Sequence, residues 1–167
     1  RHRHVFFYDD HFAANPRRTK ELLRRIIAER GRTHDVETFS AQIRADSARD
    51  PELLDLMAEA GFNQLYIGFE SVNPRTLELY RKHQTLEDIE TAVREIHERR
   101  MAIHGMFVFG SDADTTEIFR ATAAFAKRMR LESVQFLILT PLPGSALYDS
   151  LEAAGRITNR NWGQYDA

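Results

Sequence analysis

Side chains and glycines able to contact a ligand follow or bracket five separate apolar stretches of this chain. When parallel strands form one sheet, the residues after them meet at its carboxyl edge. The candidate positions are Asp9, Asp10, Arg44, Glu70, Ser71, Gly105, Gly110 and Thr140. They include acceptors, a cation, hydroxyl groups and glycines, so we predict that they share one polar cavity.

Glu70 is the strongest of these candidates. It lies between Phe69 and Ser71, directly after an apolar run, where a carboxylate needs a partner or a ligand. Arg44 has two equally good interpretations. It is either an ion-pair partner of Glu70 or Asp10, or a cation that binds a ligand.

Other candidates also have a local interpretation beside the functional one. Asp9 and Asp10 either begin a loop and cap the next helix, or bind a ligand. Gly105 and Gly110 bracket one apolar run, where glycine either permits close approach of a ligand or simply forms a turn. Asp112 is interpreted as a turn residue.

The elements that must position these residues follow a regular alternation. Runs rich in β-branched and aromatic residues recur about one βα unit apart. They begin near Val5, Val36, Gln64, Ile103 and Val134. Segments with helical periodicity separate them, which indicates a parallel sheet with right-handed crossovers. No linker interrupts the pattern, so residues 1–167 are expected to form a single domain.

Two architectures agree with this α/β alternation: an open doubly wound sheet and part of a (β/α) TIM-like barrel. The first apolar run is not followed by a glycine-rich turn, which disfavours a dinucleotide-binding fold. Five βα units are too few to close an eight-stranded barrel. The chain is then either a partial barrel or a part of a larger one.

Composition excludes several classes of function. The 167 residues carry 23 Lys+Arg and 25 Asp+Glu, and the net charge of -2 does not favour binding to nucleic acid or an anionic membrane. No apolar run approaches the ~20 residues that span a bilayer. The chain contains no cysteine, so it provides no disulfide, thiolate nucleophile or cysteine-ligated metal. A cytoplasmic location is expected.

Several stretches together resemble the radical S-adenosylmethionine (SAM) family, most closely its cobalamin-associated subgroup. They occur in the family's order and cover nearly the whole chain. The matching stretches are FYDDHF (7–12), QLYIGFESVNPRTL (64–77), HGMFVFGSDADT (104–115), LTPLPGSALYD (139–149) and GRITNRNWGQYD (155–166). TPLPGS followed by GRI and NW is the most specific combination.

The resemblance implies a partial barrel of six βα units, of which this chain would provide the second to the sixth. In that family a CxxxCxxC loop after the first strand holds a [4Fe–4S] cluster, and SAM chelates its open iron. One electron cleaves SAM and gives a 5′-deoxyadenosyl radical. Methyl transfer is a common outcome in the cobalamin subgroup.

For the amino-acid part of SAM, the resemblance implies contacts from two segments. Asp9 and Asp10 would lie near the amino group, with which carboxylates form charge-assisted hydrogen bonds. Arg44 would pair with the carboxylate.

For the nucleoside part of SAM, the resemblance implies contacts from three further segments. Glu70 and Ser71 resemble the ribose motif, as an acceptor and a hydroxyl for the sugar diol. The strand from Gly105 to Gly110 would lie beside the adenine, and Thr140 would line the adenine side.

The cysteine loop of the family does not occur in this sequence. We therefore expect this chain alone to be catalytically inactive. Activity would belong to a longer parent, to which the resemblance assigns the cluster segment and a cobalamin-binding domain. Its substrate would be a small molecule that the sequence does not identify. The strand that begins near Val5 would have an open edge, which favours self-association.

Two other functions stay open from the residues alone. Carboxylates bind hard cations, so a metal-dependent barrel hydrolase could use Asp9, Asp10, Glu70 and Asp112. The chain could also be a non-catalytic binding module. SAM binding, divalent-ion binding or neither would separate the three hypotheses.

Overall fold

The computed structural model describes residues 4–30, 37–82 and 84–165. Five strands form one sheet in the order β1-β2-β3-β4-β5, and every neighbouring pair is parallel. The strands are β1 (His4–Phe7), β2 (Thr38–Ile43), β3 (Phe62–Glu70), β4 (Ala102–Phe109) and β5 (Ser133–Ile138). The predicted start of the second strand near Val36 lies outside the described residues.

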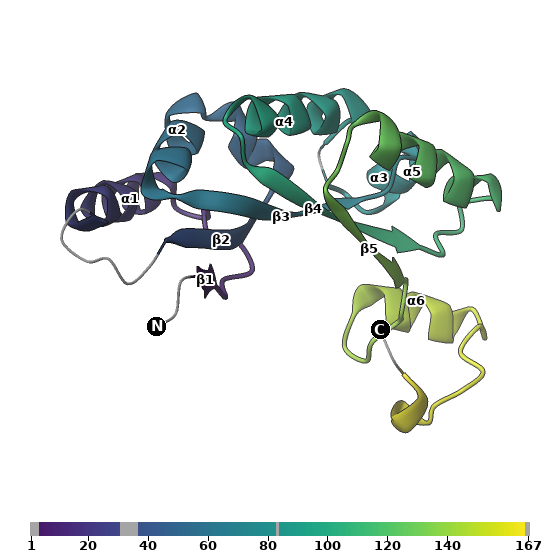
Figure 1. The fold of residues 1–167 in the computed structure, drawn as a ribbon. Helices are drawn as coiled ribbons and strands as arrows, with labels where there is room; N and C mark the ends of the chain where they lie inside the picture. The colour runs from purple at the N-terminus through teal and green to yellow at the C-terminus, as the bar shows by residue number, and fades with distance from the viewer. Residues whose placement is uncertain (1–3, 31–36, 83, 166–167) are drawn as a thin grey trace.

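Helices connect successive strands, and two more helices follow the last strand. They are α1 (Pro16–Arg30), η1 (Ala45–Arg49), α2 (Pro51–Ala60), α3 (Pro74–Leu79), α4 (Leu86–Glu98), α5 (Glu117–Arg128), α6 (Ala146–Ala153) and η2 (Trp162–Gln164). Figure 1 shows α1, α2, α4 and α5 on one side of the curved sheet. The sequential strand order with helices on one side confirms the predicted partial (β/α) barrel, because a doubly wound sheet has helices on both faces.

The core lies between the sheet and the helix layer. Along β3, buried Leu65, Ile67 and Phe69 alternate with half-buried residues that point to the other face. Leu54 and Ile89 contribute from α2 and α4, and both are fully buried. One face of β3 is therefore fixed by apolar packing, which directs its alternate residues toward the concave face.

The concave face of the sheet is polar and aromatic. The Nδ1 atom of His104 lies 2.8 Å from the Oγ atom of Ser133, and the ring centroids of His104 and Tyr66 are 4.8 Å apart. The Phe6 ring packs edge-on against Tyr66 at 5.2 Å, and His4 bonds to Ser40 at 2.9 Å. This face corresponds to the inside of a barrel.

Local sequence explains the helix boundaries. Asp50 caps α2 by accepting a hydrogen bond from the Leu53 N–H at 3.1 Å, Pro51 occupies the first turn, and Gly61 ends the helix in the left-handed region. Thr85 and Asp88 form a reciprocal capping box at α4. These caps fix the first residues of α2 and α4.

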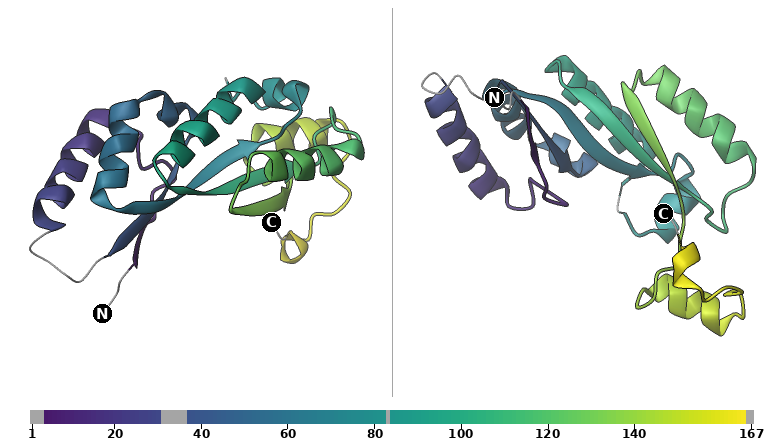
Figure 2. Two further views of the ribbon diagram at one scale, coloured as in Figure 1. Left: turned by 45° about the horizontal axis from the view of Figure 1, so that its top comes forward. Right: turned by 60° about the horizontal axis from the view of Figure 1, so that its bottom comes forward.

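The C-terminal segment lies beyond the carboxyl end of β5, outside the layer of the other helices (Figures 1 and 2). It is joined to the loop after β4 by Arg156, which makes two hydrogen bonds to Asp112 at 2.6 and 2.7 Å. Ile157, the next residue, is buried. In the part of the chain that the structure describes, no helix is both long and apolar enough to cross a bilayer.

Candidate functional site

The predicted site residues lie mainly at one edge of the sheet. Because all five strands are parallel, their carboxyl ends share one edge, and Asp10, Arg44, Glu70, Gly110 and Thr140 each end or follow a different strand there. The arrangement brings together groups that are far apart in the sequence. It provides carboxylates, a guanidinium group and exposed backbone at a common edge.

Glu70 has the most constrained geometry at this edge. Its φ is 65°, in the left-handed region, and the β3–β4 register shifts between Gly68 and Glu70. A Cβ at Gly68 would lie 2.5 Å from the Glu70 Oε1 atom. The absence of a side chain at Gly68 therefore makes room for the Glu70 carboxylate over the end of the strand.

The cationic partner of Glu70 is Lys82, whose Nζ lies 2.7 Å from Oε1. Arg44 instead pairs with Asp46, with distances of 3.0 Å from NH2 to Oδ2 and 3.2 Å from Nε to Oδ1. The predicted ion pair of Arg44 with Glu70 or Asp10 is thus wrong. The reason is local, since Arg44 precedes η1 and Asp46 lies in its first turn.

The loops after β3 and β4 brace each other. The Asp114 Oδ1 atom accepts hydrogen bonds from Asn73 Nδ2 at 3.0 Å and Thr76 Oγ1 at 2.7 Å. Ser71 is buried, and its Oγ accepts the Asn73 N–H at 3.0 Å. The Ser71 hydroxyl therefore already supports the turn that leads into α3.

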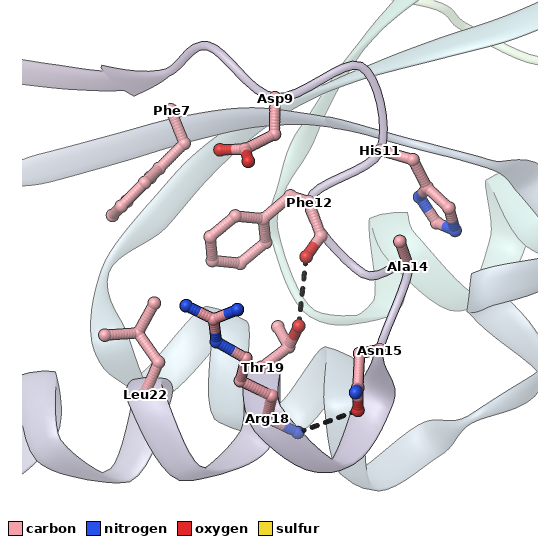
Figure 3. Close-up of a pocket in the computed structure, with 9 residues that line it drawn as sticks. All are labelled: Phe7, Asp9, His11, Phe12, Ala14, Asn15, Arg18, Thr19 and Leu22. Atoms are coloured by element: carbon pink, nitrogen blue, oxygen red, sulfur yellow. Dashed lines mark hydrogen bonds between the residues drawn. The ribbon is translucent and has the colours of Figure 1, made fainter.

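Asp9 and Asp10 both lie just beyond β1 and are exposed, but Asp9 lines two depressions and Asp10 lines one of them. Asp9 lines one of about 340 Å³ between the end of β1 and α1, and Figure 3 shows its carboxylate on the same side as Phe12 and the Arg18 side chain. Asp10 lines a smaller one together with Gln42 and other residues. Asp9 also lines this second depression, so the two aspartates are not equivalent.

Gly110 and Gly105 differ in what their missing side chains allow. Gly110 has a φ of 112° and follows β4, where the backbone conformation favours glycine. A Cβ at Gly105 would lie 2.9 Å from Leu131 Cδ1 and 3.2 Å from the Phe69 ring, on the helix side of β4. Core packing explains this glycine, so a ligand could contact only its backbone.

The last predicted contact residue, Thr140, follows β5. Its hydroxyl donates to the Ile138 carbonyl at 3.0 Å, and the side chain is half-buried. The preceding Leu139 N–H donates to the Phe109 carbonyl at 2.7 Å, which continues the pairing of β4 with β5. Thr140 is therefore held close to the end of β4.

The hydrolase hypothesis finds no support in the described residues, which contain no group of three or more His, Asp or Glu side chains that could hold a metal ion. Asp112, one of the carboxylates that it requires, is occupied by the two hydrogen bonds from Arg156. This guanidinium group holds the pKa of Asp112 below its usual value. Glu70 forms an ion pair with Lys82 through Oε1.

Three buried polar atoms at the carboxyl edge have no partner among the described residues. They are His11 Nδ1, Tyr80 OH and Asp114 Oδ2. Burial lowers the pKa of His11 and raises that of Tyr80, which the negative charges of Asp114 and Glu70 raise further. Unsatisfied buried groups are unusual in folded proteins, and these atoms are polar groups that a ligand could contact.

Sequence reasoning identifies Glu70 but misses Gly68, Lys82 and Tyr80. Gly68 interrupts the apolar run directly before Glu70, which is a usable signal because glycine in a strand often marks a bulge or a close approach. Lys82 and Tyr80 carry no comparable signal. They reach Glu70 only through the turn after α3.

Comparison with known proteins identifies the family of this chain. A profile of the radical SAM superfamily matches residues 1–126. Among curated proteins, bacteriochlorophyllide d C-12(1)-methyltransferase of Chlorobaculum tepidum is 32% identical over 161 residues, which cover 96% of this chain and 34% of that protein. Hopanoid C-2 methylase of Rhodopseudomonas palustris is 27% identical over 93% of this chain and 30% of its own length.

The fold also matches a solved structure. The radical S-adenosylmethionine methyltransferase TsrM from Kitasatospora setae, with cobalamin and a [4Fe–4S] cluster bound, superposes with a TM-score of 0.78 and 23% sequence identity. The match covers 91% of this chain and 29% of TsrM. The chain thus spans about a third of the length of the relatives that it matches.

Proposed function

Because this chain belongs to the radical SAM superfamily, we propose that the carboxyl edge of its sheet binds S-adenosylmethionine. The observation that carries the proposal is the conformation of Glu70. Its carboxylate extends from a strained backbone at the end of β3, over a glycine that leaves room for it. Strain of this kind persists at ligand-binding positions.

We assign a role to each group at the edge by its chemistry. Asp10, with Asp9 beside it, accepts from the amino group of SAM, and Arg44 turns from Asp46 to the carboxylate. Glu70 accepts from the ribose hydroxyl groups. In these assignments a carboxylate faces the amino group of SAM, a guanidinium group faces its carboxylate, and a second carboxylate faces the ribose.

The nucleoside end of SAM has its own contacts in this proposal. Ser71 stabilises the turn beside the ribose through Asn73, while the exposed backbone at Gly110 and the half-buried Thr140 flank the adenine. Gly105 contributes backbone only. The unsatisfied Tyr80 hydroxyl and Asp114 Oδ2 support a polar ligand at the same edge.

The chain has no cysteine, so it cannot provide thiolate ligands for a [4Fe–4S] cluster. We propose that a cluster segment outside these 167 residues completes the site, and that this chain alone is inactive. When bound, the cluster supplies the electron that cleaves SAM. The chain's own residues hold and orient SAM beside it.

For the intact protein we propose methyl transfer with cobalamin as a further cofactor. The methyltransferase and methylase names of the two curated relatives support the reaction, and the cobalamin bound in TsrM supports the cofactor. The substrate is a small molecule that reaches the concave face of the sheet. A cytoplasmic location belongs to the same proposal.

SAM titration calorimetry on the intact protein tests this function. Glu70→Ala should weaken SAM binding about tenfold or more, because a ligand hydroxyl loses a charged acceptor. Glu78→Ala is the matched control, since Glu78 is an exposed carboxylate on the neighbouring α3. Equal affinities of wild type and Glu70→Ala, or binding of divalent ions in place of SAM, would contradict the proposal.

A further inference from the structure

We infer that Lys82 is a positioning residue, which holds the Glu70 carboxylate in its ligand-binding orientation. The inference rests on the proposed function of Glu70 and adds a group that acts through it. Lys82 Nζ lies 2.7 Å from Glu70 Oε1. The Glu70 side chain is 18% exposed and that of Lys82 36%, so both charges are partly shielded from water.

The backbone of Glu70 does not by itself fix its carboxylate. The residue follows a bulge and has a φ of 65°, and, apart from its chain neighbours, the only atoms within 4 Å of a Cβ built at Gly68 belong to the Glu70 carboxylate group. A glutamate side chain has three rotatable bonds and loses rotamer entropy when it is held. Lys82 supplies the contact that selects one orientation over Gly68.

The ion pair leaves part of Glu70 available. Lys82 contacts Oε1, while Oε2 accepts no hydrogen bond from the described part of the chain. A carboxylate has acceptor sites on both oxygens. Lys82 therefore orients one oxygen and leaves the other for a ligand.

The connector after α3 positions Lys82 beside the end of β3. Arg81 has a φ of 51°, which turns the chain, and the Lys82 N–H donates to the Leu77 carbonyl at 3.4 Å. Two residues after Lys82, Gln84 Nε2 donates to the Phe69 carbonyl at 3.1 Å. One short connector thus contacts both Phe69 and Glu70, the last two residues of β3.

A double-mutant cycle separates positioning from a purely structural role. SAM affinity is measured by calorimetry on the intact protein for Lys82→Met, Glu70→Gln and the double variant, and thermal melting is recorded for each. Lys82→Met should weaken SAM binding about fivefold to tenfold. The double variant should bind no more weakly than Glu70→Gln alone, because Lys82 acts through Glu70.

Two further variants keep the test sharp. Lys82→Arg retains the positive charge and should restore most of the affinity. Lys20→Met is the matched control, because Lys20 also pairs with carboxylates, at 2.7 Å from both Asp50 and Glu52, but between α1 and α2. It should leave SAM affinity unchanged.

Each alternative result overturns the inference in a recognisable way. If Glu70→Gln weakens SAM binding but Lys82→Met does not, or the two effects multiply in the double variant, Lys82 does not act through Glu70, and the proposed function stands. If Lys82→Met and Lys82→Arg both melt early and lose affinity together, the contact is structural. If Glu70→Gln binds SAM as wild type does, the proposed function fails first.

Discussion

Glu70 is one of four non-glycine residues with positive φ among those the structure describes. The other three are arginines just beyond the ends of α3, α4 and α5, where a left-handed residue commonly follows a helix. Glu70 instead ends a strand. A glycine at this position would avoid backbone strain of roughly 1–3 kcal/mol. We therefore infer that the Glu70 side chain has a function beyond forming the turn.

The space beside Glu70 gives a prediction about Gly68. Gly68→Ala places a Cβ 2.5 Å from the present position of Glu70 Oε1 and forces the carboxylate to move. We expect SAM affinity, measured by calorimetry, to fall at least fivefold, an effect of about 1 kcal/mol. The melting temperature should change little, because the displaced atom is the end of a flexible, partly exposed side chain.

Gly105→Ala is the contrasting variant on the next strand. Its Cβ would meet Leu131 and the buried Phe69 ring, so it should destabilise the protein by about 1–3 kcal/mol through overpacking. Urea unfolding should show this loss. If Gly68→Ala lowered stability and Gly105→Ala lowered only SAM affinity, the assignment of the two glycines would be reversed.

At this scale the sequence predicts Glu70 but not its surroundings. A carboxylate that ends an apolar run is visible as a pattern, because burial without a partner is costly. The partner is not visible, since the approach of Lys82 to Glu70 depends on the turn between α3 and α4. Arg44 is the opposite case. The sequence offers it as an ion-pair partner of Glu70, but in the structure it pairs with Asp46, two residues away.

The start of α4 gives a prediction on pH dependence. The backbone N–H of Thr85, the Arg49 guanidinium at 2.6 Å and the Thr85 hydroxyl lower the pKa of Asp88 from 3.8 to about 2. Because the folded-state pKa is lower than the unfolded value, Asp88 stabilises the fold above pH 3.8, and this contribution is lost as the pH falls toward 2.

Thermal melting of Asp88→Asn against pH checks this expectation. At neutral pH the variant should lose about 1 kcal/mol, as for other lost helix caps, and its difference from wild type should shrink between pH 4 and 2. Glu87→Gln, an exposed neighbour in the same first turn, serves as control. A difference that stayed constant down to pH 2 would mean that Asp88 does not act through its charge.

The C-terminal segment gives a prediction at the level of one element. Its attachment includes the two hydrogen bonds from Arg156 to Asp112 beside buried Ile157, while α6 has no buried residue. Arg156→Met should therefore speed limited proteolysis after β5 by severalfold and leave the sheet intact. Peptide mapping of the first cleavage site would measure this.

Arg160→Met is the control for the Arg156–Asp112 contact, because Arg160 pairs with Glu152 inside the same segment, at 2.9 Å. It removes an exposed cation without removing a link to the loop after β4. Unchanged proteolysis of Arg156→Met, or equal acceleration by both variants, would show that the segment is held in another way.

The starts of several helices follow from local sequence, because capping groups act on the residues next to them. Asp50-Pro51, Thr85 and Ser145 mark helix starts by groups that cap the first free N–H groups, and all three caps form. The bulge at Glu70 and the separate short α3 are not predicted. Both depend on how the loops after β3 and β4 pack through Asn73 and Asp114.

For the whole molecule, periodicity predicts the βα units but not their order in the sheet. The same alternation of strands and helices occurs in a doubly wound sheet and in a barrel. The absence of a glycine-rich turn and the family resemblance favour the barrel. The structure decides by placing each strand beside its predecessor. The convergence of the site residues then follows, because every carboxyl end lies at the same edge of one curved sheet.

The same order leaves β1 with β2 as its only neighbour among the described strands. A strand of this kind exposes unpaired backbone groups, and Phe6 and Tyr8 add exposed aromatic surface, with 40% and 93% of the side chains accessible. We therefore predict that the 167-residue chain taken by itself associates through β1. Sedimentation velocity should show a mass that rises with concentration.

Two matched variants of aromatic residues distinguish pairing at the strand edge from nonspecific hydrophobic association. Phe6→Lys puts a charge on the open strand and should shift the chain toward monomer, because a charged edge strand resists pairing with another copy. Phe119→Lys removes an aromatic residue that is 54% exposed, but on α5, and should leave association unchanged. A wild-type chain that stayed monomeric at all concentrations, or equal effects of both lysines, would mean that the β1 edge does not drive association.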